Sequence, residues 1–401
     1  MVDFALTEEV QKIRDMTREF ARQEMRPAGI ALDRVQDPEQ AYTSETMRTL
    51  LARAYEVGFH KMGLPKAAGG LGAPPMTGQI VQEEMAVADA GLASHFLVAP
   101  MIAGIAAGAP DKHPFYRQYL DKFVSDTKGV HSGAWAVTEP EHGSDLFQFG
   151  RPELHMDTTA VKDGDDYVIN GHKSAFVSNG WLADGILLMV NFDSAQGMEG
   201  TITFAIPGDL LGMTRGKPLN KLGLRALNQS EIFFDNVHVA PEFMLMPPGP
   251  GYKFMLERIV TGGNTAVGTL AVGVARAAYE EALAYARQRV QGGRRIGEFE
   301  TIKLKLFEAY KQIEAARALL WKSGWLLSIE QPSLPLAMAA RTFASDMAMK
   351  VTAEMVQVFG GYGISKESPV EKFYRDAKLL QIMDGTNEVV SLRAASELVG
   401  P

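Results

Sequence analysis

Three long segments of helical character make up most of the last third of the chain, and they limit the possible folds more than any other feature. They span residues 266–291, 299–329 and 336–359, and short loops such as QGGRRIGE and EQPSLP join them. Short loops between long helices place neighbouring helices antiparallel and side by side. Residues 246–401 are therefore expected to form a C-terminal four-helix bundle.

A block of strand-like runs lies before this bundle, and a helical region lies before the block. Runs such as GILLMVNF and GTITFAIP are separated by Gly, Asn and Asp, and AVKDGDDYVING carries the turn signal of a hairpin. This pattern predicts a central antiparallel β-barrel-like domain over residues 131–245. Residues 1–130 are expected to form an N-terminal helical domain, in which Thr7 caps the first helix. The fold class is α+β, and no GxGxxG follows a strand, which disfavours a Rossmann domain.

Composition excludes several classes of protein. The 401 residues include no cysteine, which excludes disulfides, thiolate metal sites and a thiol nucleophile. The eight histidines form no close pair at helical spacing, so no metal is expected. A net charge of -8 gives no diffuse attraction to nucleic acid or anionic lipid. No apolar run approaches the length of a membrane span and the N-terminus has no apolar signal region, so we expect a soluble, cytoplasmic protein with no nucleic-acid and no membrane partner.

Two segments of the β region combine aromatic and hydroxyl side chains. AWAVTEPEHGSD, residues 134–145, contains Thr138 and Ser144, and KSAFVSNGW, residues 173–181, contains Phe176 and Ser178. A phenyl ring can stack on a planar heterocycle, and hydroxyl groups can donate to its edge. A lone Phe in a strand is more commonly a core residue. Two such segments in one β domain favour a flat aromatic cofactor.

Two further segments allow both a structural and a functional interpretation. RQRVQGGRRIGEFETIK, residues 287–303, has four arginines beside two glycines, which suits a pyrophosphate but is also typical of a solvated loop. QIMDGTNEVV, residues 381–390, places Asp384 before a glycine, and Asp-Gly is a common turn pair. Taken alone, Asp384 is expected to end a helix; the other possibility is a base directed into a pocket.

Together these segments resemble the acyl-CoA dehydrogenase family over nearly the whole chain. The resemblance rests on AVTEPEHGSD, on FVSNG and on the long stretch QVFGGYG…SPVEKFYRDAKLLQIMDGTNE. It implies an FAD enzyme that oxidises an acyl-CoA thioester to the α,β-enoyl-CoA and passes the electrons to electron-transfer flavoprotein. It also implies a homotetramer in which each FAD touches a neighbouring subunit.

The resemblance assigns roles to individual residues by position. Those expected to bind the flavin are Trp135, Val137, Thr138, Gly143, Ser144, Phe176 and Ser178. Those expected on the adenosine side, at the pyrophosphate, or on the FAD of a neighbouring subunit are Thr386, Glu388, Arg289, Gln357 and Gly361. Those expected near the acyl-CoA are Ser144, Arg258, Asp89 and His95, with a structural role favoured for Asp89 and a buried or capping role for His95.

The base is the position at which the chain departs from the family pattern. Most members carry Glu where this chain has Asp384, and the base takes the α-proton while hydride leaves the β-carbon for flavin N5. Asp is one methylene shorter, and a misplacement of about 1 Å can cost ~10²-fold in rate, so a cyclic or branched acyl-CoA with a closer α-carbon is expected. Glu257, in GYKFMLERIV, is the alternative base.

Two other functions remain open at this point. Members with Asp at the base position include dehydrogenases of alicyclic carboxyl-CoA substrates and the nitroalkane oxidases, so a flavin oxidase of the nitroalkane oxidase type is the alternative function. A non-catalytic relative that binds nucleic acid is a third possibility. The net charge of -8 argues against this third possibility.

Overall fold

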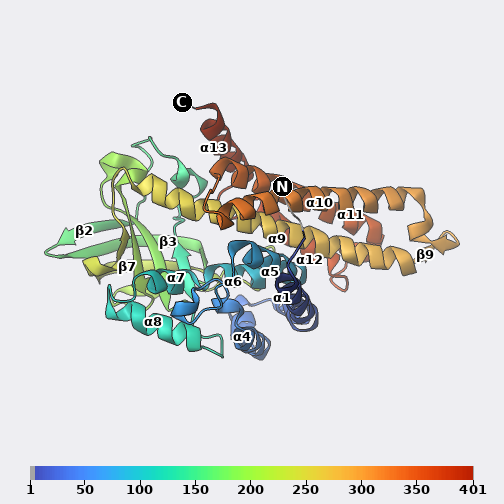
Figure 1. The fold of residues 1–401 in the computed structure, drawn as a ribbon, viewed down its shortest axis with the longest axis horizontal. Coiled ribbons are helices and arrows are strands. Elements are labelled where there is room, and N and C mark those ends of the chain that lie inside the picture. The colour runs from blue at the N-terminus through green and yellow to red at the C-terminus, as the bar shows by residue number, and fades with distance from the viewer. Residues whose placement is uncertain (1–4, 401) are drawn as a thin grey trace.

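The structure, a computed structural model, describes residues 5–400. Helices at the N-terminal side, a β-sheet and a C-terminal set of long helices follow one another along the chain (Figure 1). This is the α+β order expected from the sequence. The longest helix, α9, begins beside the sheet and continues to the far end of the bundle, so it connects both parts (Figure 1).

The N-terminal part is helical, as expected. Thr7 caps the first helix, and its Oγ1 accepts a hydrogen bond from the Val10 N–H at 3.3 Å. A π-helical turn over Ala21–Met25 joins the first two helices. The helices are α1 (Glu8–Phe20), α2 (Arg26–Arg34), α3 (Pro38–Thr43), α4 (Glu45–Val57), α5 (Pro75–Ala88), α6 (Ala90–Val98), α7 (Met101–Gly108) and α8 (Pro114–Ser125).

One stretch of this part corrects the statement that no run approaches the length of a membrane span. Within the described residues, Ala90–Gly108 is long and apolar enough to cross a membrane by length and composition, with a mean hydropathy of 1.7. It comprises α6 and α7, which are separate helices on either side of Ala99 and Pro100, and 61% of it is buried inside the protein. Core packing therefore accounts for its apolar character.

The sheet has the strand order β6-β7-β3-β1-β4-β5-β8, and β2 pairs with both β3 and β4. The second pairing closes β1, β3, β2 and β4 into a ring, which gives the barrel-like shape. The strands are β1 (Gly133–Ala136), β2 (Thr159–Asp163), β3 (Asp166–Ser178), β4 (Gly185–Asn191), β5 (Thr201–Pro207), β6 (Met213–Arg215), β7 (Gln229–Val239) and β8 (Met244–Met246).

The sheet is mixed, whereas the sequence predicted an antiparallel one. β4 runs parallel to β1 and to β2, and the other pairs are antiparallel. The connection over residues 179–184 returns the chain antiparallel to β3 but on the far side of β1. Because β1 is itself antiparallel to β3, β4 must lie parallel to β1. Strand order is a tertiary property, and hydropathy patterns do not contain it.

The C-terminal part consists of α9 (Tyr252–Gln288), α10 (Glu300–Ser328), α11 (Leu334–Phe359), α12 (Val370–Leu380) and α13 (Asn387–Val399). A small hairpin of β9 (Val290–Gln291) and β10 (Arg294–Arg295) joins α9 to α10. Small residues bring the long helices together. A Cβ added to Gly268 would lie 2.5 Å from Leu320 Cδ2 and 3.1 Å from Arg341 Cα, so α10 and α11 approach the backbone of α9 at this point.

Candidate active site

Asp384 lies on the turn between α12 and α13, with φ at 56°. Few residues other than glycine adopt a positive φ, although Asp does so more readily than most. Gly385 follows with φ at 99°. The Arg341 guanidinium donates to the carbonyl oxygens of Met383, Asp384 and Gly385, the middle one at 3.1 Å. The turn is therefore held through its main chain, and the Asp384 side chain is left free.

The Asp384 carboxylate faces open space beside α9. A Cβ added to Gly263 would lie 3.8 Å from Asp384 Oδ2, and one added to Gly262 would meet no atom within 4 Å. Among the described residues, no hydrogen bond to the carboxylate oxygens is found. The residue lies deep among protein atoms, yet its side chain is exposed, because it borders this space and not the outer surface. Burial raises the pKa of Asp384 above its usual value, and the Arg341 charge opposes that rise.

The two segments predicted to hold a flavin come together in the sheet. Trp135 on β1 lies directly opposite Ser178 on β3. Phe176, two residues earlier on β3, is 59% exposed. The buried Trp135 indole Nε1 has no hydrogen-bond partner, and Ser178 Oγ accepts from Gln229 Nε2 at 3.0 Å. An exposed ring beside an unpaired buried donor fits a planar heterocycle with a polar edge, so these residues fit FAD.

The loop after β1 connects the sheet to the Asp384 turn. Ser144 begins the 3-10 helix η4 (Ser144–Phe147), and its Oγ accepts a hydrogen bond from the Thr386 N–H at 3.0 Å. The preceding Gly143 donates its N–H to Asp145 Oδ1 at 2.6 Å, which fixes the start of η4. Ser144 and the Asp384 turn, far apart in the sequence, are therefore in direct contact.

A buried ion pair holds the loop that follows β1 against β3. Lys173 Nζ lies 2.6 Å from Glu139 Oε1, and both side chains are fully buried. Lys173 also donates to the Val137 carbonyl at 3.0 Å. The Ser174 N–H donates to the Thr138 carbonyl at 2.9 Å. These bonds attach Val137 and Thr138 to the strand that carries Phe176 and Ser178.

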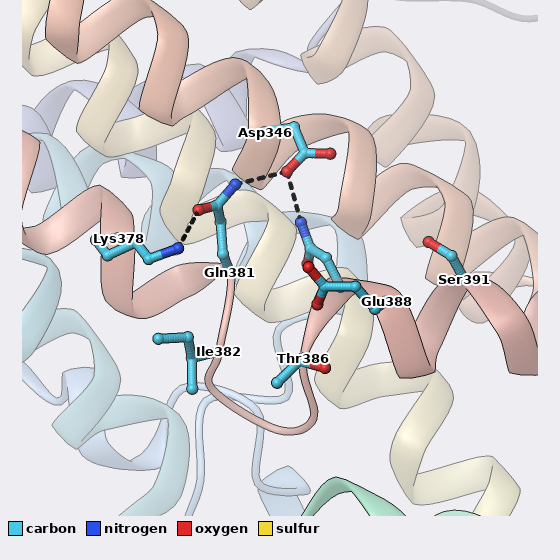
Figure 2. A pocket seen from close by; sticks show the side chains of 8 residues that line it. Asp346, Lys378, Gln381, Ile382, Thr386, Glu388 and Ser391 are labelled. Atoms are coloured by element: carbon cyan, nitrogen blue, oxygen red, sulfur yellow. Dashed lines mark hydrogen bonds between the residues drawn. The ribbon is translucent and has the colours of Figure 1, made fainter.

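An open pocket of about 460 Å³ lies on the other side of the turn, and it contains the predicted adenosine-side residues Thr386 and Glu388 (Figure 2). Asp346 lines this pocket, and its Oδ1 accepts hydrogen bonds from the side-chain amides of Gln381 at 2.6 Å and Asn387 at 2.8 Å. The lining residues are Asp346, Lys378, Gln381, Ile382, Thr386, Asn387, Glu388 and Ser391.

Arg289, Gln357 and Gly361 lie at the opposite end of the bundle. Arg289 caps the C-terminal end of α9, and Gln357 and Gly361 surround the end of α11. Tyr285 and Phe359 stack between these two ends, with ring centroids 4.2 Å apart. All three predicted residues are exposed. The structure therefore brings these three together but separates them from the flavin segments of the same chain.

Glu257, the alternative base, is engaged in ion pairs. Arg393 lies 2.7 Å from its Oε1 and Lys253 lies 3.8 Å away. Its neighbour Arg258, predicted to lie near CoA, is exposed on α9. The Glu257 carboxylate is thus engaged by two cations, whereas among the described residues no hydrogen bond to the Asp384 carboxylate oxygens is found.

The contacts of Asp89 and His95 favour structural roles. Asp89 caps α6 by accepting from the Leu92 N–H at 2.8 Å, and its Oδ2 lies 2.7 Å from Lys372 Nζ. His95 is buried and its Nδ1 lies 3.0 Å from Asn179 Oδ1. Burial lowers the pKa of His95 to about 4, so the ring is neutral at pH 7. Among the described residues, neither side chain forms a hydrogen bond or ion pair with the Asp384 turn.

Three residues at the site were missed from the sequence. Arg341 lies in the apolar stretch LAMAARTFASDMA, and an isolated arginine among alanines in a helix was the available signal. Gly263 is the second glycine of TGGN within α9, where a glycine pair disfavours helix. Lys173 was quoted only as the start of a flavin segment.

An exposed ring beside an unpaired indole donor, in a mixed sheet between two helical parts, agrees with a flavin-dependent enzyme. The chain belongs to the acyl-CoA dehydrogenase family. It matches the family's N-terminal domain over residues 7–116, its middle domain over residues 134–237 and its C-terminal domain over residues 249–398. The protein is thus an oxidoreductase of the acyl-CoA dehydrogenase kind, and its cofactor is FAD.

Individual relatives cover the whole chain. It is 33% identical to the short-chain specific acyl-CoA dehydrogenase of Clostridium acetobutylicum, over 98% of each chain. It is 33% identical to the cyclohex-1-ene-1-carbonyl-CoA dehydrogenase of Geobacter metallireducens, over 99% of each. The solved butyryl-CoA dehydrogenase of Megasphaera elsdenii superposes with a TM-score of 0.86 at 31% identity, over all of both chains.

Proposed function

We propose that the protein oxidises a cyclic or branched acyl-CoA to its α,β-enoyl-CoA, and that Asp384 takes the α-proton. The observation that carries this proposal is the free Asp384 carboxylate, which faces the space left by Gly262 and Gly263. FAD, when bound, supplies the acceptor for the hydride that leaves the β-carbon. The relatives named above are acyl-CoA dehydrogenases, so they give no support to the nitroalkane oxidase alternative.

The chain's own groups account for the proton removal. The α-proton of a thioester is weakly acidic, so the base needs a raised pKa and the carbonyl oxygen needs hydrogen-bond donors as negative charge develops. Burial supplies the first requirement at Asp384. The Ser144 hydroxyl beside the turn is a donor for the second, and the Thr386 N–H, which now donates to Ser144 Oγ at 3.0 Å, becomes one when the substrate carbonyl replaces that acceptor.

The substrate class follows from the space opposite the base. Two adjacent glycines inside a helix cost about 1 kcal/mol each relative to alanine, and the described contacts show no packing that requires them. Their absent side chains leave room for substituents on the α-carbon. The shorter Asp384 side chain then places the carboxylate further from α9 than a glutamate would. One relative acts on a cyclic acyl-CoA by name, and another is short-chain specific, so a substrate panel decides.

The panel compares straight C4–C8 acyl-CoAs with alicyclic and α-branched ones by anaerobic flavin bleaching, in the wild type and in Gly263→Ala. We expect the wild type to prefer the cyclic or branched compounds. The added methyl group is expected to lower kcat/KM for those compounds by about 10–200-fold and to leave the straight compounds nearly unchanged. Preference of the wild type for straight chains contradicts the proposed substrate class.

The pH dependence of the reaction follows from the raised pKa of Asp384. A base works only when deprotonated, so kcat/KM falls as the pH is lowered through the pKa of the free enzyme's base. Because burial raises that pKa, we expect the acidic limb of the profile above the usual aspartate value of 3.8. A profile of kcat/KM between pH 4 and 9 measures it. A limb at or below 3.8 contradicts the assignment.

We further propose that the active protein is a homo-oligomer, a tetramer as in the family, with electron-transfer flavoprotein as its acceptor, and that it works in the cytoplasm. The α9 helix advances 25 residues from Gly263 to Gln288, roughly 37 Å, so Arg289 is remote from the base of its own chain. Arg289, Gln357 and Gly361 are then available to the FAD of a second copy. This arrangement agrees with their common exposed location at the far end of the bundle (Figure 1).

A further inference from the structure

We propose that Arg341 is the positioning residue of the base, and that it acts through the main chain of the 383–385 turn and through its charge. The inference rests on the proposed role of Asp384. It adds a residue from a different helix, α11. In the turn, Arg341 donates to the main-chain carbonyls of residues 383–385, and no hydrogen bond from it to the Asp384 carboxylate is found.

Arg341 is the largest fully buried side chain among the described residues, with 0% of its surface exposed. The backbone of α11 packs closely against α9 at Arg341, because a Cβ added to Gly268 would lie 3.1 Å from Arg341 Cα. From there the guanidinium reaches the turn. Nη1 donates to the Asp384 carbonyl at 3.1 Å and to Asn264 Oδ1 at 3.2 Å, and Nη2 donates to the carbonyls of Met383 and Gly385.

Three consecutive carbonyls can converge on one cation only if the chain turns sharply between them. The positive φ values of Asp384 and Gly385 produce that turn. A residue in the left-handed region is retained only where its surroundings hold it. The planar fork of an arginine can bind several acceptors at once, which the single ammonium of a lysine cannot reproduce in the same geometry.

The charge of Arg341 has no carboxylate paired to it by a hydrogen bond. Burial lowers the pKa of Arg341 to about 10, and Asp384 is the one charged group that raises it. Asp346, the next acid along α11, is bound to Gln381 and Asn387. Among the described residues the arginine and the base are therefore the one charged pair at this site. Each favours the ionised form of the other across the backbone of the turn.

This arrangement separates two tasks. The bonds to the carbonyls fix where the Asp384 carboxylate lies, and the charge influences the pH at which it ionises. If Arg341 were bound to the carboxylate itself, its charge would depress the basicity of Asp384 more strongly than it does across the backbone of the turn. Binding to the carbonyls instead leaves both carboxylate oxygens available to receive a proton.

Two substitutions separate the tasks, tested on the FAD-loaded enzyme. Arg341→Lys keeps the charge and loses the fork; we expect anaerobic flavin reduction to slow by about 10²-fold with the acidic limb of the pH profile unmoved. Arg341→Gln loses the charge as well; we expect the limb to move to higher pH. In both variants, amide hydrogen exchange over residues 383–387 should rise by about tenfold or more, which is a readout independent of activity.

Arg276→Lys is the matched control, because Arg276 is a buried arginine of α9 that binds Glu83 and Glu84 and not the turn. It should leave both the pH limb and the exchange of residues 383–387 unchanged. Wild-type exchange and wild-type pH limbs in both Arg341 variants overturn the proposal. So does failure of Arg341→Lys to fold while Arg276→Lys folds, because Arg341 would then support the whole fold and not the turn. If acyl-CoA reduced the flavin of the Asp384→Asn variant at the wild-type rate, the proposed base would be wrong. The hydrogen-exchange data would still test whether Arg341 holds the 383–385 turn through its carbonyls.

Discussion

Asp384→Asn is expected to remove the dehydrogenase activity and to leave the protein folded. The variant keeps the size and hydrogen-bonding capacity of the side chain but cannot accept the α-proton. General bases typically contribute about 10²–10⁴-fold, so the rate of anaerobic flavin reduction by acyl-CoA should fall by at least that range. The Arg341 guanidinium donates to the main-chain carbonyls of Met383, Asp384 and Gly385 and not to the substituted side chain, so the turn should persist.

The same substitution should raise the melting temperature at pH 7, or leave it unchanged. A carboxyl group whose pKa is raised by folding binds more protons in the folded state than in the unfolded state, between 3.8 and the raised value. Folding stability therefore falls as the pH rises through that window, and the loss persists at neutral pH. Removing the charge with Asn cancels the loss. Glu257→Gln is the control: it should retain activity and lose some stability, because it removes the ion pair with Arg393 at 2.7 Å.

Lys173→Met is expected to give the largest loss of stability. Lys173 and Glu139 are both fully buried and 2.6 Å apart. Burial acts to raise the pKa of Glu139, but the charge and hydrogen bond of Lys173, together with the bonds from Thr158 and Asp157, outweigh it and lower that pKa. Burial lowers the pKa of Lys173 to about 8, and the short distance supports a charged pair. Removing one partner of a buried pair costs about 3–5 kcal/mol. Chemical denaturation of the holoenzyme should show a decrease of that size.

The double variant Lys173→Met/Glu139→Gln should recover most of the loss, because it leaves no uncompensated buried charge. Recovery should be incomplete, because Glu139 Oε2 accepts from the Asp157 N–H at 2.5 Å and Oε1 from the Thr158 N–H at 3.0 Å. The one amide oxygen of the introduced glutamine can replace only one of these two acceptors. Lys12→Met, which breaks an exposed pair with Glu8, should cost less than about 1 kcal/mol. A loss below about 1 kcal/mol in Lys173→Met, or no recovery in the double variant, contradicts the account.

The sequence predicted the elements and the family more fully than it predicted their arrangement. Hydropathy patterns and turn residues placed the long helices and the hairpin of β2 and β3, because these depend on local periodicity. The parallel pairing of β1 with β4 depends on which side of β1 the chain returns, and no local pattern records that. The apolar stretch over 90–108 has the composition of a membrane span, and only its packing identifies it as core.

At the site, too, the sequence predicted individual segments but not the contacts between distant ones. Trp135 and Ser178 were chosen from separate segments, and the register of β1 with β3 brings them face to face. Arg341 could not be assigned because its role requires a turn that begins 42 positions further along the chain. The structure also offers a reason for aspartate at the base position. A φ of 56° is adopted more readily by Asp than by most other residues that carry a side chain, so this sharply held turn favours the shorter acid.

Exchange of the α-proton is the most direct test of the claim that Asp384 is the base. An acyl-CoA with oxygen or sulfur in place of the β-carbon has no hydride to lose, so proton removal can be observed alone. In D₂O, with FAD bound, the wild type and Glu257→Gln should incorporate deuterium at the α-carbon at similar rates, followed by NMR, and Asp384→Asn should be slower by at least about 10²-fold. Exchange that persists in Asp384→Asn and disappears in Glu257→Gln would contradict the account.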